Sequence, residues 1–145
     1  MKEIGKKVLE VEANAIKKIS ERLDKNFDQA VELLYSTKGR VIVTGIGKSG
    51  IIGRKIAATF TSTGTPSLFI HATDAVHGDL GAFQKDDVVI VISYSGETEE
   101  VISLLQYIKR IGSKLIAITG NINSTLAKHS DIVLDVSVER EACPI

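Results

Sequence analysis

The segment with the clearest chemical potential is VVIVISYSGETEE, residues 88–100. Its five consecutive β-branched residues suit a strand that is buried on both faces, as in a parallel sheet. Three hydroxyls follow around Gly96, and this glycine lets the backbone approach a ligand closely. The acidic residues after it indicate the start of a helix, whose first turn presents unpaired N–H groups at the positive end of the helix dipole. Hydroxyls beside a helix N-terminus form an anion site, so we expect phosphate to bind at Ser93, Ser95 and Thr98.

The same hydroxyls have a plainer interpretation, because serine and threonine also cap helices and stabilise turns. We favour phosphate because three hydroxyls around one glycine are more than a cap needs. Glu97, Glu99 and Glu100 complement the helix dipole, and a carboxylate directed at a phosphate would repel it. A carboxylate that faces the pocket would therefore transfer protons further along a substrate, and helical spacing does not say which of the three it is.

A second loop of this kind is GIGKSG, residues 45–50. It matches the dinucleotide pattern GxGxxG, but no acidic residue ends the next strand to hold a ribose, which disfavours a dinucleotide oxidoreductase. The Walker pattern fails as well, because Ile42 occupies the position of its first glycine. What remains is a strand–turn–helix loop with Lys48 and Ser49 at its tip, or simply a tight turn with a solvated lysine.

Two further candidates stand alone in the sequence. His77 lies in a loop flanked by glycines, where a single histidine is more often structural than catalytic. Glu141 follows the last predicted strand and by itself is a surface acid. The three histidines and the single cysteine lack metal-ligand spacing, so no metal site is expected.

Composition restricts the function classes. The 145 residues are about the size of one domain, and 18 basic residues balance 18 acidic ones. Zero formal net charge argues against non-specific nucleic-acid binding, which needs a basic face. Cys143 cannot form an internal disulfide, no leader begins the chain, and no apolar run approaches the ~20 residues of a membrane span. We therefore expect a soluble cytoplasmic protein without nucleic-acid or membrane partners.

The elements that position these loops alternate after residue 40. Before it, helical periodicity predicts a helix over 4–23 and a second one that Asn26 and Gln29 cap and Gly39 ends. The second helix would bury Phe27, Ala30, Val31 and Leu34. Strands are predicted at 41–43, 68–70, 88–92, 115–118 and 132–134, helices at 51–60, 98–110 and 124–128, and a long loop or irregular helix at 71–84. This alternation predicts a parallel sheet, with ligands where the loops after the first, third and fourth strands converge.

Together, these segments resemble a known family. VIVTGIGKSGIIGRKIAATFTSTGTPSLFIHATDAVHGDLG, VISYSGETEEV, IAITG and VEREACP are similar to the sugar-isomerase (SIS) domain of arabinose-5-phosphate isomerases, over nearly the whole chain. SYSGET indicates only an SIS domain, whereas GKSG, HGDLG and EACP together are specific to the arabinose-5-phosphate type. The resemblance implies an α/β fold: a three-layer α-β-α sandwich with a five-stranded parallel, flavodoxin-like sheet, preceded by N-terminal helices. Residues 1–145 would form one SIS domain, with helices over 1–38 and an α/β core over 40–145.

The resemblance also implies an activity. The substrate would be a sugar phosphate, and the reaction would interconvert D-ribulose 5-phosphate and D-arabinose 5-phosphate through an enediol, with no cofactor and no metal. The product would feed 3-deoxy-D-manno-octulosonate synthesis for lipopolysaccharide or capsule. Family members are commonly tetramers whose sites take residues from neighbouring subunits, so a homo-oligomer, a tetramer, is expected.

By motif position, the resemblance implies two sets of site residues. The substrate-binding set is Gly47, Ser49, Ser93, Tyr94, Ser95 and Thr98, and the catalytic set is Lys48, His77, Glu100 and Glu141. Isomerisation through an enediol needs a base and a cation or donor for the developing oxyanion. Glu100 or Glu141 would be the base. Lys48 would polarise the carbonyl or hold the substrate, and His77 would assist proton transfer or ring opening.

The chain departs from the family pattern at its end. It stops at Ile145, where the family continues into a serine/threonine-rich loop and a closing helix, so we expect an SIS domain truncated at the C-terminus. A non-catalytic SIS module that senses sugar phosphates is the alternative from another class. Such modules in regulators carry a helix-turn-helix segment, whereas the N-terminal helices here carry acids as freely as bases. An isomerase of another phosphosugar is the third interpretation.

Overall fold

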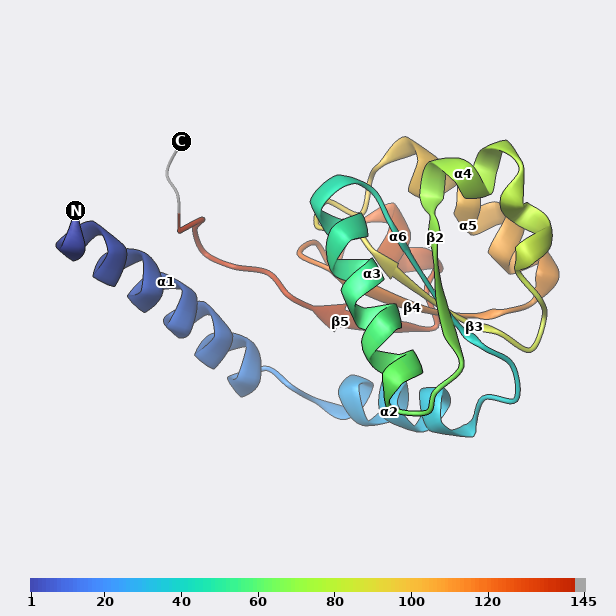
Figure 1. Cartoon of the computed structure of the whole chain (residues 1–145), viewed down its shortest axis with the longest axis horizontal. Helices are drawn as coiled ribbons and strands as arrows, with labels where there is room; N and C mark the ends of the chain where they lie inside the picture. The colour runs from blue at the N-terminus through green and yellow to red at the C-terminus, as the bar shows by residue number, and fades with distance from the viewer. Residues whose placement is uncertain (143–145) are drawn as a thin grey trace.

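The structure, a computed structural model, describes residues 1–142 and consists of two N-terminal helices followed by an α/β unit (Figure 1). The N-terminal helices are α1 (Lys2–Glu21) and α2 (Lys25–Ser36). The strands are β1 (Val41–Gly45), β2 (Ser67–His71), β3 (Val88–Ile92), β4 (Lys114–Thr119) and β5 (Ile132–Asp135). The helices between them are α3 (Gly47–Ser62), α4 (Ala72–His77), the 3-10 helix η1 (Asp79–Ala82), α5 (Glu99–Ile111) and α6 (Thr125–His129).

The five strands form one parallel sheet in the order β2-β1-β3-β4-β5, which confirms the predicted sheet. Gly45 at the end of β1 pairs with His71 on one side and with Ile92 on the other. The chain moves outward to β2 from β1 and then returns to add β3, β4 and β5 on the opposite side. The switch point therefore lies between β1 and β3, and the loops that follow these two strands open at the same edge of the sheet.

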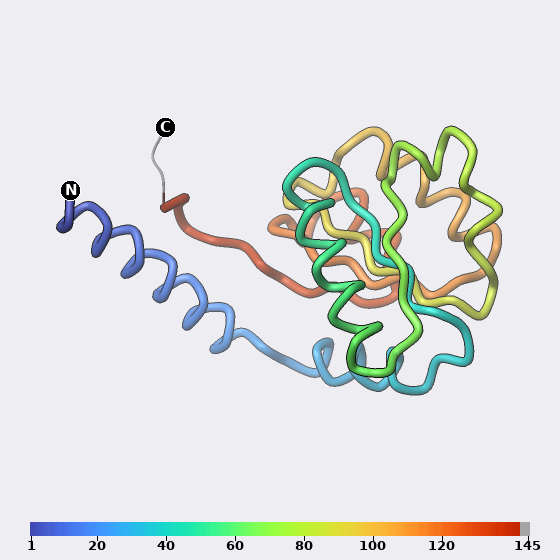
Figure 2. Tube along the Cα trace, viewed as in Figure 1, coloured from blue at the N-terminus to red at the C-terminus, as the bar shows by residue number. Residues whose placement is uncertain are grey.

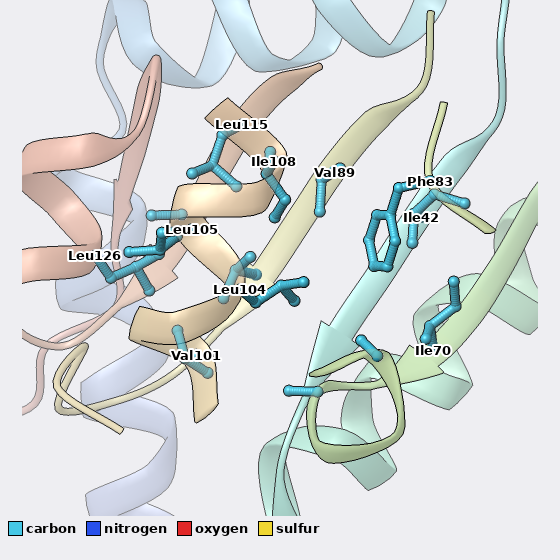
Figure 3. Packing of buried hydrophobic residues seen from close by; sticks show 14 residues of the cluster. Ile42, Ile70, Phe83, Val89, Val101, Leu104, Leu105, Ile108, Leu115 and Leu126 are labelled. Carbon is cyan, nitrogen blue, oxygen red and sulfur yellow. The ribbon is translucent and has the colours of Figure 1, made fainter. Parts of the chain in front are cut away.

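Both faces of the sheet are covered, so the predicted three-layer sandwich is confirmed. Val41 and Val43 of β1 pack on the side of α2 and α3, and Ile42 between them packs on the side of α4, α5 and α6. Figure 3 shows this second cluster, in which Leu104 and Ile108 of α5 belong to the layer over the strands. Each such buried side chain contributes about 1.5–3 kcal/mol of hydrophobic stabilisation, which holds the strand ends, and hence their loops, in place.

The boundaries of α2 differ from the prediction. The N-cap is Asp24, whose carboxylate accepts a hydrogen bond from the Asn26 N–H at 2.8 Å, so the predicted capping pair of Asn26 and Gln29 is wrong. Aspartate satisfies the first orphan N–H groups as well as asparagine does, and it stands two residues earlier. The helix also ends at Ser36, before Gly39.

The inward face of α2 is only partly covered. Ala30 is buried as predicted, but Phe27 and Val31 are 42% and 50% exposed, which contradicts their predicted burial. They line an apolar groove of about 410 Å³ between α2 and α3, over the carboxyl halves of the central strands. Nothing in the described chain fills this groove.

Helix α1 projects from the α/β unit beside the segment that follows β5 (Figures 1 and 2). None of its residues is buried. Ionic contacts tie it to that segment: Lys18 pairs with Glu139, and Arg22 contacts both Asp135, at 3.7 Å, and the Ser137 carbonyl, at 2.7 Å. None of the helices in residues 1–142 is long and apolar enough to cross a membrane.

These contacts shift two carboxyl groups in the same direction. The hydrogen bond from Lys18 and its charge hold the pKa of Glu139 below its usual value. Burial alone would raise the pKa of Asp135, but the Ser137 N–H and the charge of Arg22 outweigh it and keep this pKa low as well.

Candidate active site

The loop after β1 is shorter than predicted, because α3 begins at Gly47 rather than at Ile51. Lys48 and Ser49 therefore belong to the first helical turn, where Lys48 is exposed and Ser49 is half-buried. The N-cap residue, Ile46, has no side chain that could accept hydrogen bonds from this turn. The first N–H groups of α3 thus have no side-chain cap in the described structure and open at the switch point.

The loop after β3, residues 93–98, holds its hydroxyls in a compact turn and is called the hydroxyl loop below. The Gly96 N–H donates to Ser93 Oγ at 3.2 Å, and Ser93 Oγ lies 3.2 Å from Thr98 Oγ1. The Glu97 N–H donates to Ser95 Oγ at 3.3 Å, which leaves the hydroxyl proton of the exposed Ser95 available for a ligand. The local hydrogen bonds therefore orient the hydroxyls and still leave a donor for an anion.

Helices α3 and α5 start beside each other at the switch point, because β1 and β3 are neighbours in the sheet. Neither has a side-chain cap among residues 1–142, whereas α2 and α6 are capped by Asp24 and Ser124. Two uncapped helix N-termini and three hydroxyls form a concentrated set of donors. This arrangement suits an anion such as a phosphate.

A segment that follows β4 braces the hydroxyl loop from the other side. The Tyr94 carbonyl accepts hydrogen bonds from the Gly120 N–H at 3.0 Å and from Thr119 Oγ1 at 3.2 Å. The Leu126 N–H donates to the Gly96 carbonyl at 3.1 Å. The sequence predicted that this loop would be near, but residues 119–126 carried no signal of these bonds beyond the helix start at Ser124.

The side chain of Tyr94 is part of the same brace. A Cβ at Gly120 would lie 2.4 Å from the Tyr94 ring, so only glycine leaves room for the ring there. The Tyr94 hydroxyl accepts a hydrogen bond from the Val138 N–H at 3.3 Å and thereby reaches the segment after β5. In the described structure, this side chain connects two loops.

The three carboxylates at the start of α5 have different surroundings. Glu97 Oε1 accepts a hydrogen bond from the Thr125 N–H at 2.7 Å, and hydrogen bonding by Thr125 holds the pKa of Glu97 below its usual value, with a further contribution from the charge of Lys128. Glu99 is exposed, and Glu100 is half-buried in the first turn. Glu97 is thus occupied by α6, which leaves Glu100 as the shielded carboxylate nearest the hydroxyl loop.

The remaining candidates lie apart from this cluster. His77 is half-buried at the end of α4, which follows the edge strand β2. Glu141 is exposed on the segment after β5, directly after Arg140, which lines a hollow together with residues of α1. The described chain therefore brings Lys48, Ser49 and the hydroxyl loop with Glu100 to one edge, and it does not bring Glu141 there.

No group of three His, Cys, Asp or Glu side chains within residues 1–142 is placed to hold a metal ion. Cys143, the single cysteine of the chain, lies outside the described residues. The chemistry available at the switch point is that of hydroxyls, backbone N–H groups, one lysine and one half-buried carboxylate. This set can bind an anion and move a proton.

Comparison with known proteins places the chain in a family. The SIS domain family matches residues 33–144. A protein of Haemophilus influenzae named "Probable arabinose 5-phosphate isomerase" is 53% identical over 97% of this chain, and arabinose 5-phosphate isomerase KdsD of Pseudomonas aeruginosa is 50% identical over the same share. The chain spans only 42% and 43% of the lengths of these two relatives.

A solved structure agrees with the match. The c3406 protein of Escherichia coli CFT073, in complex with a sugar phosphate, superimposes with a TM-score of 0.91 at 45% identity, covering 96% of this chain and 74% of that one. The two-sided parallel sheet, the hydroxyl loop at its switch point and these similarities lead to the same conclusion: the chain belongs to the SIS domain family.

Proposed function

We propose that residues 1–145 act as one SIS domain of an aldose–ketose isomerase, which interconverts D-ribulose 5-phosphate and D-arabinose 5-phosphate through an enediol. The observation that carries the proposal is the donor cluster at the switch point, where the hydroxyl loop meets two uncapped helix starts. The names of the curated relatives support this substrate, as does the similar c3406 protein, whose bound ligand we take to be arabinose 5-phosphate.

The phosphate would bind at Ser95 and the pair of Ser93 and Thr98, with Gly47, Ser49 and Tyr94 at the margins. These groups donate hydrogen bonds without adding negative charge, as a dianion requires. The sugar would then extend from the phosphate toward the first turns of α3 and α5. Lys48, at the exposed start of α3, would stabilise the oxyanion that forms on the sugar carbonyl.

Glu100 is the base that we favour for proton transfer between C1 and C2. It is two residues from Thr98 and half-buried, so it can reach a substrate that the loop holds by its phosphate. Glu141 is the alternative base and His77 the assisting group. Both would need to approach the switch point from elsewhere, for example from a neighbouring subunit.

A self-associated protein would fit these requirements, and we propose a homotetramer without cofactor or metal, located in the cytoplasm. The exposed apolar residues of α1, including Ile4, Leu9 and Ile16, and the groove beside Phe27 offer surfaces for such contacts. The product would serve 3-deoxy-D-manno-octulosonate synthesis. Sedimentation of the purified chain tests the assembly, and a monomer at micromolar concentration would contradict it.

The activity is tested by incubating the chain with D-arabinose 5-phosphate in deuterated water and following the C2 proton by NMR. We expect loss of that proton together with the appearance of ribulose 5-phosphate. Glu100→Gln should slow the exchange about 10²- to 10⁴-fold with little change in phosphate affinity, because the amide cannot accept the proton. Glu99→Gln, a matched change at the exposed neighbouring position, should behave as the wild type.

Two outcomes would change the assignment. Full turnover by Glu100→Gln would remove Glu100 from the mechanism and leave Glu141 as the base. Binding of the phosphosugar by a folded wild-type chain without any exchange would favour the sensing module over the isomerase.

A further inference from the structure

The hydroxyl loop after β3 and the start of α6 fit together as one unit. A Cβ at Gly96 would lie 2.1 Å from Ser124 Oγ, so the two segments are in direct contact. The Leu126 N–H donates to the Gly96 carbonyl, and the Ser124 hydroxyl accepts from the Ala127 N–H at 3.2 Å. The position of α6 therefore determines where the loop lies.

Glu97 makes the side-chain contact that joins these two segments. Its carboxylate accepts the Thr125 N–H, a first-turn donor of α6, across a separation of 28 residues in the chain. The backbone N–H of the same residue donates to Ser95 Oγ. One residue thus binds α6 through its side chain and orients a ligand hydroxyl through its backbone.

Electrostatics explains why this carboxylate is tolerated beside a phosphate site. A carboxylate directed at the phosphate would repel it, whereas Glu97 is directed at the positive end of α6 and toward Lys128. The negative charge is therefore used to fix the loop.

We propose that Glu97 is a positioning residue: its carboxylate holds the hydroxyl loop against α6 and so sets the geometry of the hydroxyls that receive the substrate phosphate. The role of these hydroxyls rests on the function proposed above. Glu97 itself contacts neither the phosphate nor the reacting carbons.

The test compares Glu97→Ala, Glu97→Gln and the control Glu99→Ala in the whole chain. The glutamine amide oxygen can still accept the Thr125 N–H, whereas alanine cannot. Three quantities are measured for each variant: the Kd for inorganic phosphate by NMR titration, KM and kcat with D-arabinose 5-phosphate, and hydrogen exchange of the Thr125 amide.

We expect Glu97→Ala to raise both the phosphate Kd and KM by about 3- to 10-fold, the size of one lost hydrogen bond, with kcat changed by less than about twofold. The Thr125 amide should exchange faster in this variant. Glu97→Gln should restore all three quantities to near their wild-type values, and Glu99→Ala should leave them unchanged.

Two results would overturn the proposal. The first is an unchanged Kd and KM in Glu97→Ala. The second is a large loss of kcat at constant KM in both Glu97 variants, which would make Glu97 an acid or base. A wild-type chain that binds no phosphosugar would instead refute the proposed function, and Thr125 exchange would still decide whether Glu97 holds the loop.

Discussion

Replacing Gly96 by alanine tests how tightly the hydroxyl loop is packed. Gly96 has φ +66°, and an added Cβ would lie 2.1 Å from Ser124 Oγ and 2.5 Å from Ser124 Cβ. Non-bonded carbon atoms ordinarily approach to about 3.5–4.0 Å, so the two segments must separate by roughly 1 Å or more. The substitution therefore combines backbone strain with a steric clash.

Gly112 provides a matched control for the backbone term. It ends α5 with φ +84°, and a Cβ there would meet no atom within 4 Å. Gly112→Ala should lower the free energy of unfolding by about 1–2 kcal/mol, the cost of a left-handed residue with a side chain. Gly96→Ala should lose the same amount plus about 1–3 kcal/mol for overpacking, so about 2–5 kcal/mol in all.

Urea or thermal unfolding of both variants measures the difference, at about 2–4 °C in Tm per kcal/mol for a chain of this size. The gain from a less flexible unfolded chain is the same for both substitutions and cancels in the comparison. Adding Ser124→Gly removes both clashing atoms and should recover part of the Gly96→Ala loss. Equal destabilisation of Gly96→Ala and Gly112→Ala would refute the close packing of this loop against α6.

Two further predictions concern charged groups. Asp87 is 2% exposed beneath a 2.9 Å ion pair whose arginine is 35% exposed, so Asp87→Ala should cost about 3 kcal/mol in urea unfolding, the low end for a broken buried pair. Phosphate affinity should not change, since Asp87 precedes β3 at the opposite sheet edge, and Asp86→Ala, at the exposed neighbour, should have little effect on either measurement. Acid should release α1: because the pKa values of Asp135 and Glu139 are lowered on folding, their contacts stabilise the protein above the ordinary carboxyl range near pH 4 and are lost as pH falls through the lowered values. Proteolysis or hydrogen exchange of α1 should speed up over that range, and Lys18→Ala, which already lacks one contact, should respond less steeply.

The sheet could be predicted from the sequence because its strands are short, apolar and separated by helical segments. Residues 88–92 are buried throughout, as five β-branched residues in a row indicate. Periodicity was less informative for α1 and α2. It identified helices, but it could not say that Phe27 would remain exposed, because burial depends on what packs against the helix.

The candidate site could be predicted in part. Loop chemistry and parallel topology together predicted that the residues after β1 and β3 would lie at one edge. The contact of Glu97 with Thr125 could not be predicted, because a bond across 28 residues leaves no local pattern. The resemblance placed Glu141 at the active site, whereas in the described chain it lies on the segment beside α1.

The order of the strands also governs how the protein folds. No two neighbouring strands in the described chain are joined by a hairpin: the Ser67–Val41 bond closes 26 residues, and the Arg40–Asp87 pair closes 47. Closing the longer loop costs about 3 kcal/mol of chain entropy before any pairing offsets it, which makes such sheets slow to form. The Ser93 N–H bonds to the Ile118 carbonyl of β4, so the hydroxyl loop is fixed only when β1, β3 and β4 are all in register. Acquisition of phosphate affinity during refolding therefore cannot precede assembly of the central strands, and ligand binding reports the last stage of folding.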